Sequence, residues 1–126
     1  MSALNPVVAI GDDILDCLSR LPKGTYAKAA KFIMRFRSDP RSSGINYERI
    51  KNAKDENLRS VRIDQNLRGI VLAPEKGNVY VLLWVDNHDD AYKWALNRMA
   101  RVNVASGSLQ VFSVDEQVST LGRQKS

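Results

Sequence analysis

Three apolar runs joined by short turns constrain the fold of this chain more than any other feature of its sequence. Residues 58–63 (LRSVRI) alternate between apolar and polar side chains, which is typical of a strand with one buried face. Residues 67–73 (LRGIVLA) return after a turn at 64–66, and residues 79–86 (VYVLLWVD) follow a second turn at 74–78. Strands joined by turns this short pair antiparallel, so the sequence predicts a three-stranded meander with the very apolar run 79–86 as its central strand.

One more strand and a first helix are expected before the meander. Residues 5–10 (NPVVAI) favour an edge strand, because Pro6 has no N–H to donate to a second neighbour. Residues 11–13 (GDD) begin a helix with apolar side chains at helical spacing, and their carboxylates suit the positive end of its dipole. Pro22 and Gly24 are expected to end this helix.

A second helix is predicted from Thr25, as its cap, to about Arg37. One of its faces is apolar, and the other carries basic residues, namely Lys28, Lys31, Arg35 and Arg37. The turn between the two helices is about three residues long, so they are expected to form an antiparallel hairpin. The hairpin would cover one face of the sheet and leave the other face open.

Less regular segments surround this framework. Residues 45–57 form a connector, and Asp89 or Asp90 begins a third helix after the meander. Residues 109–114 (LQVFSV) predict a last strand, and the tail, about 119–126, is expected to be frayed. The whole chain of 126 residues is therefore expected to form one α+β domain.

Charge and composition narrow the class of protein. Lys and Arg total 19 against 14 for Asp and Glu, and the resulting net charge of +5 favours a polyanionic partner. The alternative is a solvated basic surface. Cys17 is the single cysteine, which excludes an intrachain disulfide, and its place on an apolar stripe suits a core residue. No apolar run approaches the roughly 18 residues that span a membrane. A secretory signal is not recognisable, so we expect a cytoplasmic protein.

Two arginines of the meander are candidates for phosphate recognition. Arg62 leaves its strand on the face opposite to Val61 and Ile63, and Arg68 follows the turn on the next strand. They can therefore meet at one end of the hairpin, where two guanidinium groups offer forked sets of donors to a phosphate. The alternative is a pair of solvated arginines on neighbouring strands.

His88 is the only histidine, and Tyr92 follows it at the i+4 position, so the two share a face at the start of the third helix. An imidazole and a phenol can carry protons near a phosphate, whereas the alternative is a capping or packing pair. One histidine without further nitrogen or sulfur ligands does not make a zinc site, so no metal or other cofactor is expected. Trp84 and Trp94 favour core packing over base stacking, and Asp55 is expected at the surface.

Residues 58–94 resemble the core pattern of the RelE/ParE toxins: a strand with a basic residue, a turn, a strand opening with an arginine, an apolar strand, and a histidine-to-tyrosine segment. A closer likeness covers nearly the whole chain. It is to the RelE-like region at the N-terminus of some UvrD/Rep-like superfamily I helicases, and the segments that carry it are KNAKD (51–55), LRSVR (58–62), LWVD (83–86), HDDAY (88–92) and LQV (109–111). The helicase motor and its phosphate-binding loop are absent from these residues, so they carry no ATPase activity.

The resemblance implies a RelE-like α+β fold, with the antiparallel sheet packed against the N-terminal helical hairpin, and cleavage of messenger RNA. By position it matches the catalytic residues of the toxins to Arg68, Arg62, His88 and Tyr92. The candidates for holding nucleic acid are Arg59, Arg62, Arg68 and Lys93. Asp89 and Asp90 depart from the toxin pattern, which usually has basic residues there, and two carboxylates would repel a phosphate.

Three functions remain open at this point. The first is a nucleic-acid-binding module with weak or no cleavage, as an accessory domain fused to a helicase motor or as a free-standing relative. The second is a ribosome-dependent endoribonuclease toxin with a small acidic antitoxin. The third is a protein-interaction module that binds an antitoxin-like helix or a replication protein. The sequence does not distinguish RNA from DNA, and it does not give the oligomeric state or the identity of an antitoxin.

Overall fold

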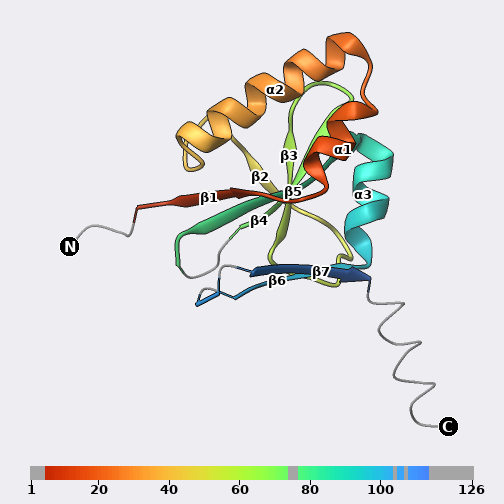
Figure 1. The fold of residues 1–126 in the computed structure, drawn as a ribbon. Helices are drawn as coiled ribbons and strands as arrows, with labels where there is room; N and C mark the ends of the chain where they lie inside the picture. The colour runs from red at the N-terminus through yellow and green to blue at the C-terminus, as the bar shows by residue number, and fades with distance from the viewer. Residues whose placement is uncertain (1–4, 74–76, 104, 107, 114–126) are drawn as a thin grey trace, which may run out of the picture.

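The computed structural model describes residues 5–73, 77–103, 105–106 and 108–113, and Figure 1 shows their arrangement. None of the helices in these residues is long and apolar enough to cross a membrane. The predicted tail, 119–126, lies outside the described residues. In chain order the elements are β1 (Val7–Ile10), α1 (Ile14–Ser19), α2 (Lys23–Ser38), β2 (Tyr47–Arg49), β3 (Leu58–Arg62), β4 (Leu67–Leu72), β5 (Val79–Asn87), α3 (His88–Leu96), β6 (Arg98–Asn103) and β7 (Ser108–Ser113).

The main sheet has five strands in the order β1-β5-β4-β3-β2, and β6 pairs with β7 in a separate sheet. The predicted antiparallel meander of β3, β4 and β5 is confirmed, and β1 is an edge strand that runs parallel to β5. The central place predicted for residues 79–86 is wrong, because β1 pairs outside β5 and β2 pairs outside β3, which leaves β4 at the centre. The three residues of β2 are too few to give a recognisable alternation within the predicted connector.

The helices α1 and α2 pack on one face of the sheet, and α2 crosses above it in Figure 1. Apolar side chains of both helices form a core with side chains of β3, β4 and β5, and the helical ones are Ile14, Cys17, Leu18, Ala29, Phe32 and Phe36. Cys17 is 1% exposed, and its burial raises the pKa of the thiol, as expected for a core residue.

The predicted boundary between the first two helices needs correction. α2 begins at Lys23 rather than Thr25, so Gly24 lies in its first turn and does not end α1. Pro22 stands at the N-cap, and its carbonyl accepts the N–H of Tyr26 at 2.9 Å. A proline fits this position because the first N–H groups of a helix have no partner within it.

The second face of the sheet is covered, which corrects the prediction of an open face. α3 and the β6–β7 pair pack on it, on the right and at the bottom of Figure 1. Ile70 and Leu83 of the sheet are buried there with Ala91 and Ala95 of α3 and Ala100 of β6. The alanine side chains let α3 lie close to the strands. A site on this side of the sheet is therefore limited to the ends of the strands.

Asp55 is a buried carboxylate rather than the predicted surface group, and its exposed fraction is 3%. It accepts the N–H of Asn57 and the N–H of Ala100, both at 3.0 Å, and it lies 4.0 Å from the guanidinium of Arg101. A buried carboxylate is tolerated when several donors surround it. Asp55 therefore ties the start of β3 to β6 and holds the second sheet against the first.

Two tryptophans pack between four elements, as predicted for core residues. The rings of Trp84 in β5 and Trp94 in α3 stack with centroids 4.9 Å apart and an interplanar angle of 9°. The guanidinium carbon of Arg20 lies 5.3 Å from the Trp84 centroid, and that of Arg98 lies 5.2 Å from the Trp94 centroid. Since each ring has another ring near one face and an arginine over it, this stack serves packing rather than base recognition.

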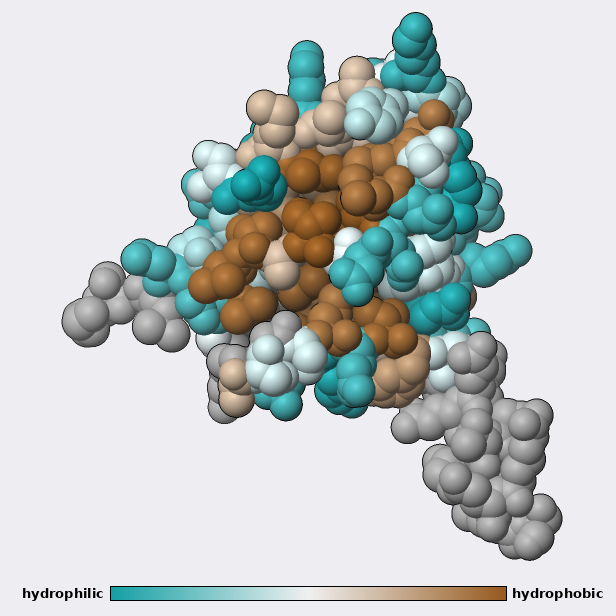
Figure 2. Space-filling model, viewed as in Figure 1, coloured by the Kyte–Doolittle hydropathy of each residue, from teal (hydrophilic) through white to brown (hydrophobic). Residues whose placement is uncertain are grey.

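Large apolar side chains are exposed on the side of β1. Figure 2, in the same view as Figure 1, shows apolar residues across this side of the molecule. β1 contributes Val7 and Ile10, which are 51% and 37% exposed, and Leu15 of α1 and Met34 of α2 are 79% and 68% exposed. Contiguous apolar surface of this kind is typical of protein contacts.

Candidate nucleic-acid site

Arg62 and Arg68 are directly opposite each other in the β3–β4 ladder, so the predicted meeting of the two arginines at one hairpin end is confirmed. Their side chains leave the same face of the sheet, which is also the face of Ile70 and α3. Asp86 of β5 is opposite Arg68 on its other side. The three charged residues form a row across the end of the sheet, beyond the part that α3 covers.

The side chains of the two arginines differ in their hydrogen bonding. The Nη1 group of Arg68 donates to the carbonyl oxygens of Asp64 at 2.7 Å, Leu67 at 3.1 Å and Gln65 at 3.3 Å. Arg62 is exposed, and its side chain makes no hydrogen bond or ion pair with another residue in the described part of the chain. Arg68 therefore supports the β3–β4 turn, whereas Arg62 offers its donors to a ligand.

His88 and Tyr92 stack on each other at the start of α3, with ring centroids 4.5 Å apart and an interplanar angle of 20°. The backbone N–H of His88 donates to the carbonyl of Asn66 at 2.8 Å, so the β3–β4 turn and the start of α3 are held together. The imidazole side chain is 49% exposed, and its Nδ1 lies 3.2 Å from the carboxylate of Asp89. The pair thus lies at the same end of the sheet as Arg68.

Hydrogen bonds between Asn87 and Asp90 cap the start of α3. Its cap is Asn87 rather than Asp89 or Asp90, since the Asn87 side chain accepts the Asp90 N–H at 2.9 Å and donates to the Asp90 carboxylate at 2.8 Å. Asp86 accepts from the Trp84 indole at 3.3 Å. Asp89 is 96% exposed, so it is the carboxylate that an approaching phosphate would meet first.

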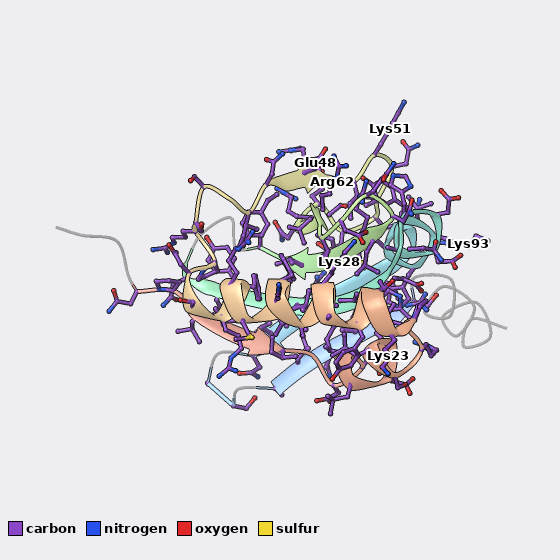
Figure 3. The ribbon with its side chains drawn as sticks, turned by 90° about the horizontal axis from the view of Figure 1, so that it is seen from above. Lys23, Lys28, Glu48, Lys51, Arg62 and Lys93 are labelled. Atoms are coloured by element: carbon purple, nitrogen blue, oxygen red, sulfur yellow. The ribbon has the colours of Figure 1, made fainter. Side chains whose placement is uncertain are left out.

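The structure does not bring Arg59 and Lys93 to this end of the sheet. Arg59 is on the other face of β3 from Arg62, and its guanidinium donates to the carbonyls of Glu56 and Leu58. Figure 3 places Lys93 on α3 at the end of the molecule, away from Arg62. Among the described residues, no group of three or more His, Cys, Asp or Glu is arranged to hold a metal ion.

Asp64 supports the site, and sequence reasoning treated it only as a turn residue. Its carboxylate accepts the N–H of Asn66 at 2.9 Å and of Leu67 at 2.7 Å, and it lies 3.4 Å from the ammonium group of Lys28. Desolvation opposes ionisation, but these hydrogen bonds and Lys28 outweigh it and lower the pKa of Asp64 from its usual 3.8. An aspartate two residues before the N–H it binds is the signal that could have shown this role.

We expect Asp64→Ala to lower the free energy of unfolding by about 1 kcal/mol at neutral pH. Because the folded-state pKa is lowered, the carboxylate stabilises the fold above its unfolded pKa, and this contribution is lost as the pH falls through the folded pKa. The difference from wild type should be constant above about pH 5 and narrow at lower pH. Urea unfolding across this range measures it, and an equal difference at every pH would contradict the role of ionised Asp64.

No family model matches the sequence, and no curated protein matches it either. Among solved structures, the RelB–RelE antitoxin–toxin complex from Methanococcus jannaschii contains a chain with a TM-score of 0.53 and 13% identity, over 68% of this chain and 96% of that chain. A chain of the RelE–RelB complex from Pyrococcus horikoshii has a TM-score of 0.48 and 20% identity, over 67% and 96%. A chain of a toxin–antitoxin complex from Mycobacterium tuberculosis has a TM-score of 0.49 and 17% identity, over 68% of this chain and 100% of that chain. The likeness to the chain from Methanococcus jannaschii gives this chain a RelE-like α+β fold.

Proposed function

We propose that this chain is a RelE-like nucleic-acid-binding module that holds a single strand by its phosphates at the Arg62 end of the sheet. The observation that carries the proposal is the guanidinium of Arg62, which is exposed and makes no hydrogen bond or ion pair with another described residue. A guanidinium presents five donors and binds phosphate oxygens in pairs. Arg68 stands directly opposite and keeps the turn in shape, so Arg62 is presented from a fixed backbone.

Cleavage of RNA is a second candidate, which the stacked pair of His88 and Tyr92 favours. An imidazole that is half exposed can exchange protons, and the stack fixes the direction in which it points. Asp89 argues against rapid cleavage, because its carboxylate lies beside the imidazole and would repel the scissile phosphate. We therefore propose binding with weak or no cleavage as the main function.

The proposal includes a cytoplasmic setting and a protein partner. The M. jannaschii neighbour is a complex of an antitoxin and a toxin, and we propose an antitoxin-like partner for this chain as well. The apolar side chains exposed along β1 support a protein contact. As a finer proposal, based on the likeness of the segments 51–55 and 88–92, the module serves a superfamily I helicase as its accessory domain.

The affinity for a labelled single-stranded RNA should fall steeply with salt, and Arg62→Gln should weaken it. A single-strand phosphate contact contributes about 0.7 to the slope of log K against log salt, so the variant should lose about that much. At about 100 mM salt the same loss corresponds to roughly fivefold weaker binding. Fluorescence anisotropy between about 50 and 300 mM salt measures both quantities, with a single-stranded DNA of the same sequence in parallel.

Lys54→Gln is the matched control, since Lys54 is also exposed but precedes the opposite end of β3. It removes one positive charge and should leave the slope nearly unchanged. Equal losses in the two variants would assign the binding to net charge and contradict the site. Incubation of the wild-type protein with translating ribosomes tests the second candidate, and rapid message cleavage there would replace binding as the main function.

A further inference from the structure

α2 is the most strongly charged element of the molecule. It contains five basic residues, Lys23, Lys28, Lys31, Arg35 and Arg37, and no acidic residue. The net charge of the whole chain is +5, so the basic charge of this one helix equals the charge excess of the entire protein. All five residues are exposed. An excess gathered on one element produces a local positive field that a dispersed excess would not.

Three of the five residues form a row along one flank of α2. Lys28, Lys31 and Arg35 are spaced by three and four residues, so they lie on one side of the helix, beside the buried stripe of Ala29, Phe32 and Phe36. With a rise of about 1.5 Å per residue the row is roughly 10 Å long. The other two basic residues fall on the opposite flank.

The row begins at the same end of the sheet as Arg62, although α2 covers the opposite face of the sheet. Lys28 lies 3.4 Å from Asp64, which is in the turn that follows Arg62, and Figure 3 shows Lys28 on the side of α2 toward Arg62, with Lys23 farther along the helix near its start. Lys28 is the only member of the row that has an ion-pair partner in the described residues. Lys31 and Arg35 thus remain available to an external anion.

We infer that the row Lys28, Lys31 and Arg35 is a second nucleic-acid contact, which binds the backbone of a double helix while Arg62 holds a single strand. This inference rests on the proposed function and gives it a substrate class, a junction of double-stranded and single-stranded nucleic acid. A row of roughly 10 Å is long enough to contact more than one phosphate of a duplex strand. The three side chains of the row are all cationic, and the exposed Met34 follows Lys31 by three residues, at the edge of the row. A contact made mainly of charge suits a phosphate backbone better than a protein.

The double variant Lys31→Gln/Arg35→Gln tests the row with a labelled DNA duplex of about 12 base pairs. Each lost contact to a duplex removes about 0.9 from the slope of log K against log salt, so the expected loss is about 1.8. Lys23→Gln/Arg37→Gln is the matched control, because it removes the same charge from the other flank of the same helix. Its slope should change by less than about 0.5.

Equal losses in the two double variants, or a wild-type protein that does not bind the duplex, would overturn the inference. Displacement of the duplex by polyglutamate at equal charge concentration would overturn it too, since the row would then suit an acidic protein. The two proposals fail separately. Arg62→Gln should weaken single-strand binding and leave the duplex slope nearly unchanged, whereas the α2 variant should do the reverse. Thermal unfolding confirms that both double variants remain folded.

Discussion

Asp55→Ala should lower the free energy of unfolding by about 3 kcal/mol, the largest loss that we expect from one substitution. The carboxylate accepts two backbone N–H groups, from Asn57 and Ala100, in a place that water does not reach. Alanine cannot replace these hydrogen bonds, so a buried N–H on β6 loses its acceptor. For a domain of this size the midpoint of thermal unfolding should fall by roughly 10 °C.

Calorimetry or urea unfolding measures this change, and Glu56→Ala is the matched control. Glu56 is the next residue and is exposed, so its loss should cost less than about 0.5 kcal/mol. Asp55→Asn keeps one carbonyl acceptor, so its loss of unfolding free energy should lie between those of Asp55→Ala and Glu56→Ala. If Asp55→Ala unfolded at the same urea concentration as Glu56→Ala, the carboxylate would not be what holds β6 against β3.

The meander and the pairing of Arg62 with Arg68 were predictable because both follow from an alternation of period two. Once Leu58 to Arg62 and Leu67 to Leu72 are strands joined by a short turn, the register is nearly fixed, and one residue more or less would turn buried side chains outward. The turn carboxylate of Asp64 fixes it further. The residues that form this part of the site are close together in the sequence, so their pattern can be recognised without the structure.

The elements that cover the second face of the sheet, α3 and the β6–β7 pair, were not predictable in the same way. Their packing depends on Ala91, Ala95 and Ala100, which fit against the sheet because they are small, and small residues give no strong apolar signal. Asn97 is the one residue between α3 and β6, so the start of this strand carries less of a turn signal than most strand starts. From the sequence alone Asp55 is interpreted as a surface carboxylate, because the N–H that it binds belongs to Ala100, 45 residues away in the chain.

The cover changes the kind of ligand that the sheet can accept. An open face would let bases lie flat on the strands, whereas here Ser60, two residues before Arg62 on the same face, is 1% exposed. The tryptophans that could stack on bases pack on each other instead. The cationic groups left for a nucleic acid lie at the strand ends and on α2, which suits recognition of the backbone rather than the base sequence.

Asp89→Lys should therefore strengthen binding of single-stranded RNA by roughly fivefold at about 100 mM salt and make the salt slope steeper by about 0.7. The substitution removes the most exposed carboxylate beside His88 and places an ammonium group where a phosphate approaches. It also places a positive charge in the first turn of α3, so the fold should lose about 0.5 kcal/mol. Anisotropy and urea unfolding measure the two effects independently.

Glu56→Lys is the control for this gain, because it makes the same change in charge just before β3, at the end opposite to Arg62. It should raise the affinity by less than about twofold, as expected for a distant charge that salt screens. The bound strand should still contact Arg62, so Arg62→Gln in the Asp89→Lys background should lose about fivefold in affinity, as it does in the wild-type background. A gain of the same size from Glu56→Lys, or an Asp89→Lys protein that loses no affinity when Arg62 is also changed to Gln, would place the bound strand elsewhere on the molecule.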